Sequence, residues 1–282
     1  MRHSWEGYAK HAMGFDEVDP IQLRGSNDLG GLGATVLDSL DSLHLMGLTA
    51  QFADATEWVR ANFHAGEEPG ADVNVFETTI RCLGGLLSAY DLSAEPIFLE
   101  RATSLGDKLL AAFRTASGMG YGWCNLHSGA CHTPHWAPGR VYLAEFGSMQ
   151  LEMAALSRAT GNATFSDTAE RALLSLFGAP QRPVGKATGL YYSLWNPGDG
   201  TPADNRVGMG GGSDSFYEYL LKVWVLGGKT AAVQPYLERW EAAMAAMEAI
   251  LVQRSTPTGL LYLVDACACP RPPPVSAPVF SA

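Results

Sequence analysis

Apolar residues recur along most of the chain with the spacing of amphipathic helices, and the helical segments come in neighbouring pairs. Glycine-rich or polar stretches separate one pair from the next. Four helical hairpins are predicted in this way. Their helices span residues 34–46 with 50–63, 74–92 with 94–113, 141–160 with 166–177, and 214–226 with 230–252.

Four sequential hairpins of similar size predict an all-α fold, either a solenoid or a closed α/α toroid. If each hairpin contributes one inner and one outer helix, the inner helices run parallel and their N-termini meet at one mouth. Residues 188–200 are an exception to the helical pattern. Their aromatic residues surround the turn Asn196-Pro-Gly-Asp-Gly200, which predicts a small β-hairpin.

The pattern ends near residue 264, and a proline-rich stretch follows. We therefore predict one partial catalytic domain at 1–264 and an unstructured tail at 265–282, because its prolines exclude helix and its composition supports no core.

The chain has 282 residues, of which 47% are hydrophobic, so it can bury a sizeable core. Its net charge of -10 repels phosphate backbones and makes nucleic acid a poor partner. No apolar run approaches the length of a membrane span, and no signal-peptide core follows Met1. A membrane anchor, if one is used, is expected to lie outside this chain.

Acidic residues recur near the beginning of the first helix in each predicted hairpin. These residues are Asp38 and Asp41, Glu77, Glu145 with Glu152, and Asp214 with Glu218. Their convergence at one mouth would form an acidic pocket. Paired carboxylates suit glycoside hydrolysis, in which one protonates the leaving oxygen while another activates water. Carboxylates also suit a hard cation such as calcium.

Each acid also has a structural interpretation. Asn74-x-x-Glu77 and Ser215-x-x-Glu218 both fit a capping box, and an acid in a first turn complements the helix dipole without any function. Asp38 and Asp41 are harder to explain in this way, because both lie on one helical face beside an apolar stripe, where unpaired charge is costly. Arg81 lies four residues after Glu77 and suits a salt bridge to it.

Four possible metal ligands lie close together in the sequence, at Cys124, Cys131, His132 and His135. Their spacing fits no zinc pattern, so a loop closed by a disulfide is the favoured interpretation. The cluster Gly208-Met-Gly-Gly-Gly212 lacks the Lys and Ser/Thr of a phosphate loop, and we interpret it as close backbone approach at a helix entrance.

Six stretches resemble, in order, the signature segments of glycoside hydrolase family 47, the class I α-mannosidases. They are His3-Ser-Trp-Glu-Gly-Tyr8, the stretches 14–20 and 37–47, Asp72-Val-Asn-Val-Phe-Glu-Thr-Thr-Ile-Arg81 with its continuation to residue 90, and the stretches 143–152 and 213–222. The resemblance spans about residues 3–264. It implies the N-terminal part of an (α/α)7 barrel, with about four hairpins present. It also implies calcium-dependent, inverting hydrolysis of terminal α-1,2-linked mannose from high-mannose N-glycans in the endoplasmic reticulum or Golgi lumen.

Individual residues match functional positions of that family. Glu77 matches the general acid and Asp214 a second catalytic acid, while Arg81, Glu145 and Glu218 match residues that bind substrate. Asp38 and Asp41 are further substrate-binding candidates.

The family's general base and its calcium-binding threonine have no counterpart here, so no metal ligand is predicted and the chain is expected to be inactive alone. One alternative is a non-catalytic binder of mannose glycans in glycoprotein quality control. Another is a helical scaffold whose acids only cap helices.

Overall fold

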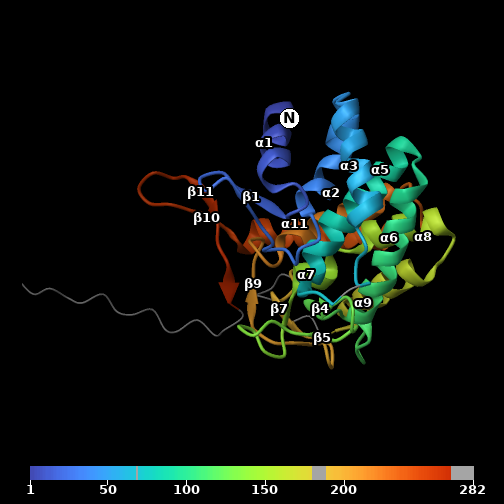
Figure 1. Ribbon diagram of the computed structural model, residues 1–282. Helices are drawn as coiled ribbons and strands as arrows, with labels where there is room; N and C mark the ends of the chain where they lie inside the picture. Colours follow the sequence, from blue (N-terminus) through green and yellow to red (C-terminus); the bar gives the residue numbers. More distant parts are fainter. Residues whose placement is uncertain (68, 180–188, 268–282) are drawn as a thin grey trace, which may run out of the picture.

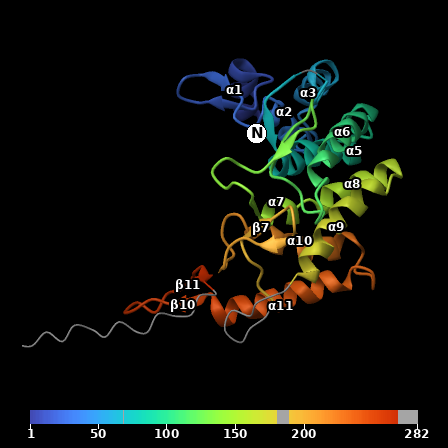
Figure 2. The same cartoon turned by 90° about the horizontal axis from the view of Figure 1, so that it is seen from below.

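Each of the four predicted pairs forms two packed helices in the computed structural model, which describes residues 1–67, 69–179 and 189–267 (Figure 1). The pairs succeed one another in space as they do in the sequence, from the first hairpin to the last (Figure 2). Their helices are α2 (Ala34–Leu45) with α3 (Thr49–Asn62), α5 (Gly84–Ser93) with α6 (Pro96–Leu109), α8 (Gln150–Thr160) with α9 (Thr164–Gly178), and α10 (Asp214–Leu226) with α11 (Gln234–Ile250).

The first helices of successive pairs lie side by side. Helix α2 packs against α5, α5 against α8, and α8 against α10, while each also packs against the second helix of its own pair. This is the arrangement predicted for the inner helices of an α/α toroid. The described residues form part of such a toroid and do not close it.

Helix α1 (Arg2–Ala12) was not predicted, although its buried residues Trp5, Tyr8 and Ala12 follow helical spacing. The first helix of the second hairpin also differs from a uniform α-helix. It consists of α4 (Val75–Glu77), a π-helical segment η1 (Thr78–Leu83) and then α5. Helix α6 continues into a 3₁₀ turn, η2 (Leu110–Phe113).

The third hairpin begins with a broken helix where one continuous helix was predicted. Helix α7 (Leu143–Gly147) ends before Ser148, and α8 begins at Gln150. The backbone N–H of Met149, which the break removes from the helical ladder, donates to Oε1 of Gln150 at 3.1 Å. A local side-chain acceptor therefore satisfies the exposed amide at the break.

Short strands lie at the entrances of two first helices. Strand β3 (Asp72–Asn74) pairs with β4 (Trp123–Asn125) and leads into α4, while β6 (Val141–Tyr142) pairs with β7 (Leu194–Asn196) and leads into α7. Strand β5 (Cys131–His132) pairs with β4. These pairings fix where both helices begin.

The predicted β-hairpin is confirmed as β7 with β8 (Thr201–Pro202). Two further antiparallel pairs are β1 (Glu17–Asp19) with β2 (Arg24–Ser26), and β10 (Val252–Arg254) with β11 (Leu261–Leu263). Strand β9 (Arg206–Val207) pairs with β12 (Ala266–Cys267), which includes the first residues of the predicted tail. Residues 268–282 lie outside the described residues.

A buried carboxylate, Asp16, holds the entrance of α2. Its two oxygens accept hydrogen bonds from the backbone N–H groups of Leu29 and residues 31–34, at 2.7 to 3.1 Å. These donors include orphan amides at the start of α2, which a helix otherwise leaves without a partner. On the inward face of α2, Val36, Leu37 and Leu40 are completely buried and join the main core. No helix among the described residues is long and apolar enough to cross a bilayer.

Candidate active site

Three of the predicted acids line one cavity of about 420 Å³, which lies at the N-terminal ends of α4, α7 and α10. Its lining residues are Asn74, Phe76, Glu77, Tyr142, Ala144, Glu145, Gly211, Gly212, Asp214 and Ser215. We call this cavity the acidic pocket. The predicted convergence is therefore confirmed for Glu77, Glu145 and Asp214. The predicted residues that do not line it are Asp38, Asp41, Arg81, Glu152 and Glu218.

Glu77 is held at both its backbone and its side chain. Its backbone N–H donates to Oδ1 of Asn74 at 2.9 Å, so the predicted cap is present. Its carboxylate does not complete a capping box, because Oε2 accepts from Nε of Arg81 at 2.7 Å. The salt bridge predicted from the four-residue spacing is thus confirmed. The π-helical segment begins directly after Glu77, and such segments are frequent at functional sites.

Arg81 also links the pocket to α2. Its Nη1 lies 3.3 Å from Oδ2 of Asp38 while its Nε remains on Glu77. Partial burial raises the pKa of Asp38, and the Arg81 guanidinium opposes that shift. Asp38 therefore does not line the pocket. It is connected to Glu77 through their shared partner, the Arg81 guanidinium.

Asp41 faces α5 rather than the acidic pocket. Its Oδ2 accepts from the Ser88 hydroxyl at 3.0 Å, and its Oδ1 accepts from Ser42 at 3.2 Å. The charge beside the apolar stripe is thus hydrogen-bonded. The sequence placed both acids on one helical face. It did not predict that Asp38 would contact Arg81 whereas Asp41 would bind serines.

Glu145 is the most enclosed acid of the pocket, with only 8% of its surface exposed. Burial raises the pKa of its carboxyl, an effect opposed by hydrogen bonds from the Tyr142 backbone N–H at 2.8 Å and from Nδ2 of Asn74 at 3.4 Å. A Cβ at Gly122 would lie 2.9 Å from Oε1 of Glu145. The carboxyl therefore fills space that only a glycine at position 122 leaves open.

Asn74 consequently contacts two of the three acids, accepting from Glu77 and donating to Glu145. The sequence singled out Asn74 only as a cap. Its second contact depends on β3 and α7 being adjacent, and no local pattern in the sequence reveals that adjacency.

Asp214 is exposed at the first turn of α10, and its Oδ1 accepts from the backbone N–H of Ser215 at 2.9 Å. The capping box predicted for Ser215 is wrong, because α10 already begins at Asp214. The Ser215 hydroxyl instead shares a hydrogen bond with Ser148 at 2.8 Å. Glu218, one turn further, is exposed and forms a salt bridge with Lys222.

The glycine cluster before α10 makes the close approach that was predicted. At Gly212, whose φ is +89°, an added Cβ would lie 2.5 Å from a ring carbon of Tyr142. The Gly212 carbonyl also accepts from the backbone N–H of Ala144 at 2.9 Å. A side chain at this position would push the entrance of α10 away from that of α7.

The remaining candidates form a structural loop. Cys124 and Cys131 form a disulfide between β4 and β5, as predicted. Next to it, Nε2 of His132 lies 2.9 Å from Asp72, and the His132 and His135 rings stack with centroids 5.6 Å apart. Within the described ranges, no group of three or more His, Cys, Asp or Glu side chains is placed to hold a metal ion. These residues alone do not fit the calcium that the resemblance implies.

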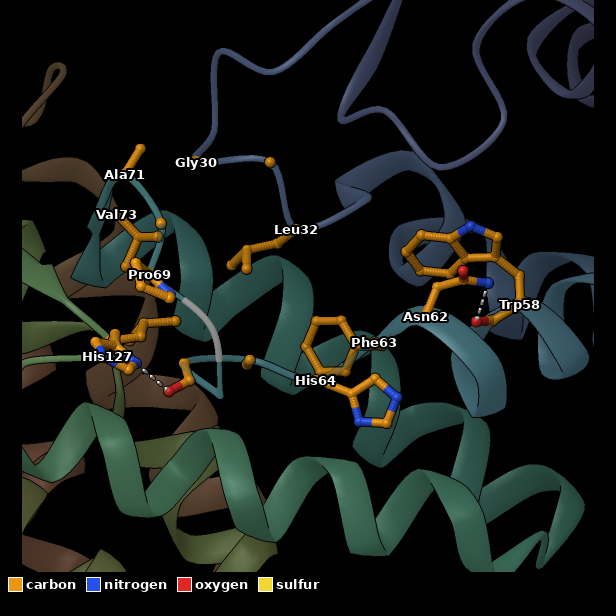
Figure 3. Close-up of a pocket in the computed structure, with 15 residues that line it drawn as sticks. Gly30, Leu32, Trp58, Asn62, Phe63, His64, Pro69, Ala71, Val73 and His127 are labelled. Carbon is orange, nitrogen blue, oxygen red and sulfur yellow. Dashed lines mark hydrogen bonds between the residues drawn. The ribbon is translucent and has the colours of Figure 1, made fainter.

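A second cavity, of about 220 Å³, lies between the loop at Gly30 and the C-terminal end of α3 (Figure 3). It contains none of the predicted site residues. Polar side chains that line it bind neighbouring backbone, with His127 on the Gly66 carbonyl at 3.3 Å and Asn62 on the Trp58 carbonyl at 3.1 Å. Because the acidic pocket gathers several carboxylates, it is the better candidate site.

The paired helices, whose first members lie side by side and three of whose entrances open on the acidic pocket, define part of an α/α barrel. Residues 1–270 match glycosyl hydrolase family 47, and the chain belongs to this family.

Mannosyl-oligosaccharide 1,2-alpha-mannosidase MNS1 of Arabidopsis thaliana is 43% identical over 266 residues, which is 94% of this chain and 46% of the relative. The human endoplasmic reticulum mannosyl-oligosaccharide 1,2-alpha-mannosidase is 39% identical over 93% of this chain and 36% of its own length. The chain thus spans less than half the length of these relatives.

The structure of alpha-1,2-mannosidase from Trichoderma reesei, an (α/α)7 barrel, superposes with a TM-score of 0.85 at 28% identity. The match covers 95% of this chain and 57% of that one. The predicted fold class is therefore confirmed, with the described residues forming part of the barrel.

Proposed function

We propose that this chain carries the general-acid side of an α-1,2-mannosidase site that acts on the high-mannose N-linked oligosaccharides of glycoproteins. The observation that carries the proposal is the acidic pocket, which brings Glu77, Glu145 and Asp214 together at three helix entrances. The names of the relatives supply the substrate class, and the human relative's name indicates the endoplasmic reticulum. The proposed location is the secretory pathway, in either the endoplasmic reticulum or the Golgi.

In this proposal Glu77 protonates the glycosidic oxygen as the bond between that oxygen and the mannose C1 breaks. Water attacks C1 from the opposite face and gives its proton to a second carboxylate. Attack from that face inverts the anomeric centre. Asp214 and Glu145 orient the sugar or the water in the pocket. The resemblance assigns the base to a carboxylate without a counterpart in residues 1–282, so the complete reaction is proposed for a domain that supplies it.

Arg81 has a specific part in this scheme. Its salt bridge with Glu77 holds that carboxyl in one orientation at the pocket, and a general acid must be positioned on the leaving oxygen. A glycan hydroxyl that accepts from Arg81 would weaken the pairing with Glu77, while Asp38 retains the guanidinium. Substrate binding is thereby coupled to the position of the acid.

Calcium dependence is proposed only for the complete catalytic domain. The described residues do not form a calcium site, and no step of the reaction is assigned to the ion here.

The first experiment measures binding of a high-mannose N-glycan to residues 1–282 by isothermal titration calorimetry. We expect Glu145→Gln and Asp214→Asn to weaken binding by at least about tenfold, because each removes a charged acceptor worth ~1.5–3 kcal/mol. The matched control is Glu100→Gln on α6, whose side chain is 67% exposed and lies outside the pocket. Equal binding by all four proteins would contradict the proposed site and favour the scaffold interpretation.

The second experiment tests catalysis. Residues 1–267 are joined to the part of Arabidopsis MNS1 that follows its matched segment, and mannose release is measured with calcium and with chelator. We expect release only from the joined protein with calcium, and at least a ~100-fold loss in Glu77→Gln. A folded, joined protein that binds glycan but releases no mannose would favour the non-catalytic binder.

A further inference from the structure

The turn between α8 and α9 carries a sequence motif that the acidic pocket does not use. Asn162-Ala163-Thr164 fits Asn-x-Ser/Thr with a middle residue other than proline, which is the acceptor motif for N-linked glycosylation. Of all the asparagines in the chain, only Asn162 has a serine or threonine two residues later. Triplets of this kind also occur by chance, so the accessibility of the motif in the fold decides what it can do.

Every residue of the motif is exposed to solvent. Helix α8 ends at Thr160 and α9 begins at Thr164, so Asn162 lies in a tight connection between two helices. Its neighbour Gly161 has a φ of +72°, as is common for the residue that ends a helix, and nothing lies within 4 Å of a Cβ added there. The turn is therefore surrounded by the open space that a bulky modification requires.

The oxygen of the Asn162 side chain holds the turn, and the nitrogen does not. Oδ1 accepts from the backbone N–H of Thr164 at 3.1 Å, which forms an Asx turn. The backbone N–H of Asn162 donates to Oγ1 of Thr160 at 3.2 Å. Within the part of the chain that the structure describes, neither Nδ2 of Asn162 nor the Thr164 hydroxyl has a hydrogen-bond partner. The two groups that define the motif are thus both accessible and unbonded.

The α8–α9 turn also lies away from the acidic pocket. The pocket is at the N-terminal ends of α4, α7 and α10, and no residue of the turn lines it. The 11 residues of α8, about 16 Å of helix, run between the break after α7 and the turn. A hydrophilic oligosaccharide on Asn162 would therefore leave the entrance of the pocket open.

A second observation indicates the compartment in which this modification takes place. Cys124 and Cys131 form a disulfide between β4 and β5. Disulfides form and persist in oxidising compartments such as the lumen of the endoplasmic reticulum, and they are rare in the cytosol. N-linked oligosaccharides are transferred to newly made chains in that same lumen. The disulfide and the exposed motif therefore point to one location.

We propose that Asn162 is the acceptor of an N-linked oligosaccharide, an inference that rests on the secretory location in the proposed function. The donor is a lipid-linked oligosaccharide diphosphate. Nδ2 of Asn162 forms a bond to C1 of the first sugar while the bond from C1 to the diphosphate oxygen breaks. The electron pair leaves with the lipid diphosphate, and Nδ2 loses one proton to a base of the transferase. The amide keeps its Oδ1, so the hydrogen bond from Thr164 survives the modification.

The test expresses residues 1–282 behind a secretion signal in cultured eukaryotic cells, so that every variant enters the lumen in the same way. Chains recovered from the lumen are treated with the amidase that removes N-glycans and leaves aspartate at the acceptor, in water labelled with heavy oxygen. We expect a faster gel mobility after treatment and labelled aspartate at position 162 by mass spectrometry. Asn162→Asp, which keeps the Oδ1 acceptor of the turn, should lose the mobility shift completely.

Thr164→Val and Thr164→Ser form the matched pair, since valine keeps the shape of threonine without its hydroxyl and serine keeps the hydroxyl. The valine variant should lose the modification and the serine variant should retain it. A lumenal wild-type chain that has formed its Cys124–Cys131 disulfide but carries no oligosaccharide would overturn the proposal. Equal modification of the valine variant would also overturn it. A glycosylated chain that fails to bind high-mannose oligosaccharide would leave this inference standing and count against the proposed function.

Discussion

Arg81, on the π-helical segment, donates from Nε to Oε2 of Glu77 across 2.7 Å, and Glu77 lies four residues earlier at the end of α4. A second donor of the same guanidinium lies 3.3 Å from Asp38. One cation therefore couples the proposed acid to α2. The arrangement is partly exposed, with 42% of the Arg81 side chain accessible, so its contribution to stability is small and its main effect is to orient Glu77.

Arg81→Ala is expected to lower the free energy of unfolding by no more than ~1 kcal/mol, the upper end for exposed ion pairs. Glycan affinity should fall more than stability, because the proposed contact is lost together with the orientation of Glu77. Urea denaturation and calorimetry on the same preparations check both. Arg60→Ala is the control, since Arg60 forms a comparable exposed pair with Glu57 outside the acidic pocket. Equal loss of affinity in both variants would contradict a specific role for Arg81.

Gly122→Ala should destabilise the protein by ~1–3 kcal/mol, the usual cost of overpacking. The added Cβ would lie 2.9 Å from a Glu145 oxygen, and the enclosed carboxyl has little room to move. Gly7→Ala is the matched contrast, because nothing lies within 4 Å of its Cβ and Gly7 is in the interior of α1. It should stabilise by ~0.5–1 kcal/mol through helix propensity. Chemical denaturation of the two variants should therefore give opposite signs.

The His132–Asp72 pair is expected to stabilise the protein only at mildly acidic pH. The backbone carbonyl of Thr133 and then Asp72 raise the pKa of His132 above 6.5, and His132 lowers the pKa of Asp72 below 3.8. The histidine's contribution is present below 6.5 and is lost as pH rises through its folded value. The contribution of Asp72 is present above 3.8 and is lost on acidification. The two overlap between these limits.

Asp72→Asn should therefore lower the pKa of His132, which NMR titration of its ring protons measures directly. The accompanying loss of stability should stay below ~1 kcal/mol because the pair is exposed, and the part due to His132 should disappear once the ring is deprotonated. Asp107→Asn on α6 serves as the control for a general change in charge. An unchanged His132 titration in Asp72→Asn would show that the 2.9 Å contact does not govern the ring.

The hairpin pattern predicted the order and extent of the helices well, because each first helix has a continuous apolar face such as Val36, Leu37 and Leu40. It did not predict the break at Ser148. The apolar spacing continues across the break, and the side chain that satisfies the freed amide, Gln150, is an ordinary helix former. Helix α1 was missed because most of its residues are polar and only three of them are buried.

The sequence predicted some residues of the candidate site and missed others. Convergence was expected for seven acids and holds for Glu77, Glu145 and Asp214, which lie where parallel inner helices bring their N-termini together. The roles of Asn74 and Gly122 depend on contacts between segments far apart in the sequence, and no local pattern contains them. Glu152 shows the same limit, because its position near Glu145 suggested a shared site, yet it lies beyond the break between α7 and α8 and its carboxyl bonds to Tyr219 on α10.

Glu152 should make the stability of residues 1–282 fall as pH rises. Burial raises the pKa of its carboxyl from 4.5 to about 7, an effect that the Tyr219 hydroxyl, the backbone N–H of Glu152 itself and Lys222 only partly offset. Because the folded value lies above the unfolded one, the folded state binds more protons between pH 4.5 and 7. The penalty is absent below 4.5, grows through this window and is complete above 7. It should reach on the order of 2–3 kcal/mol.

Urea denaturation at pH 5 and pH 8 measures this penalty, and Glu152→Gln should remove most of the difference. An equal pH dependence in Glu152→Gln and the wild type would show that the ionisation of Glu152 is not the cause.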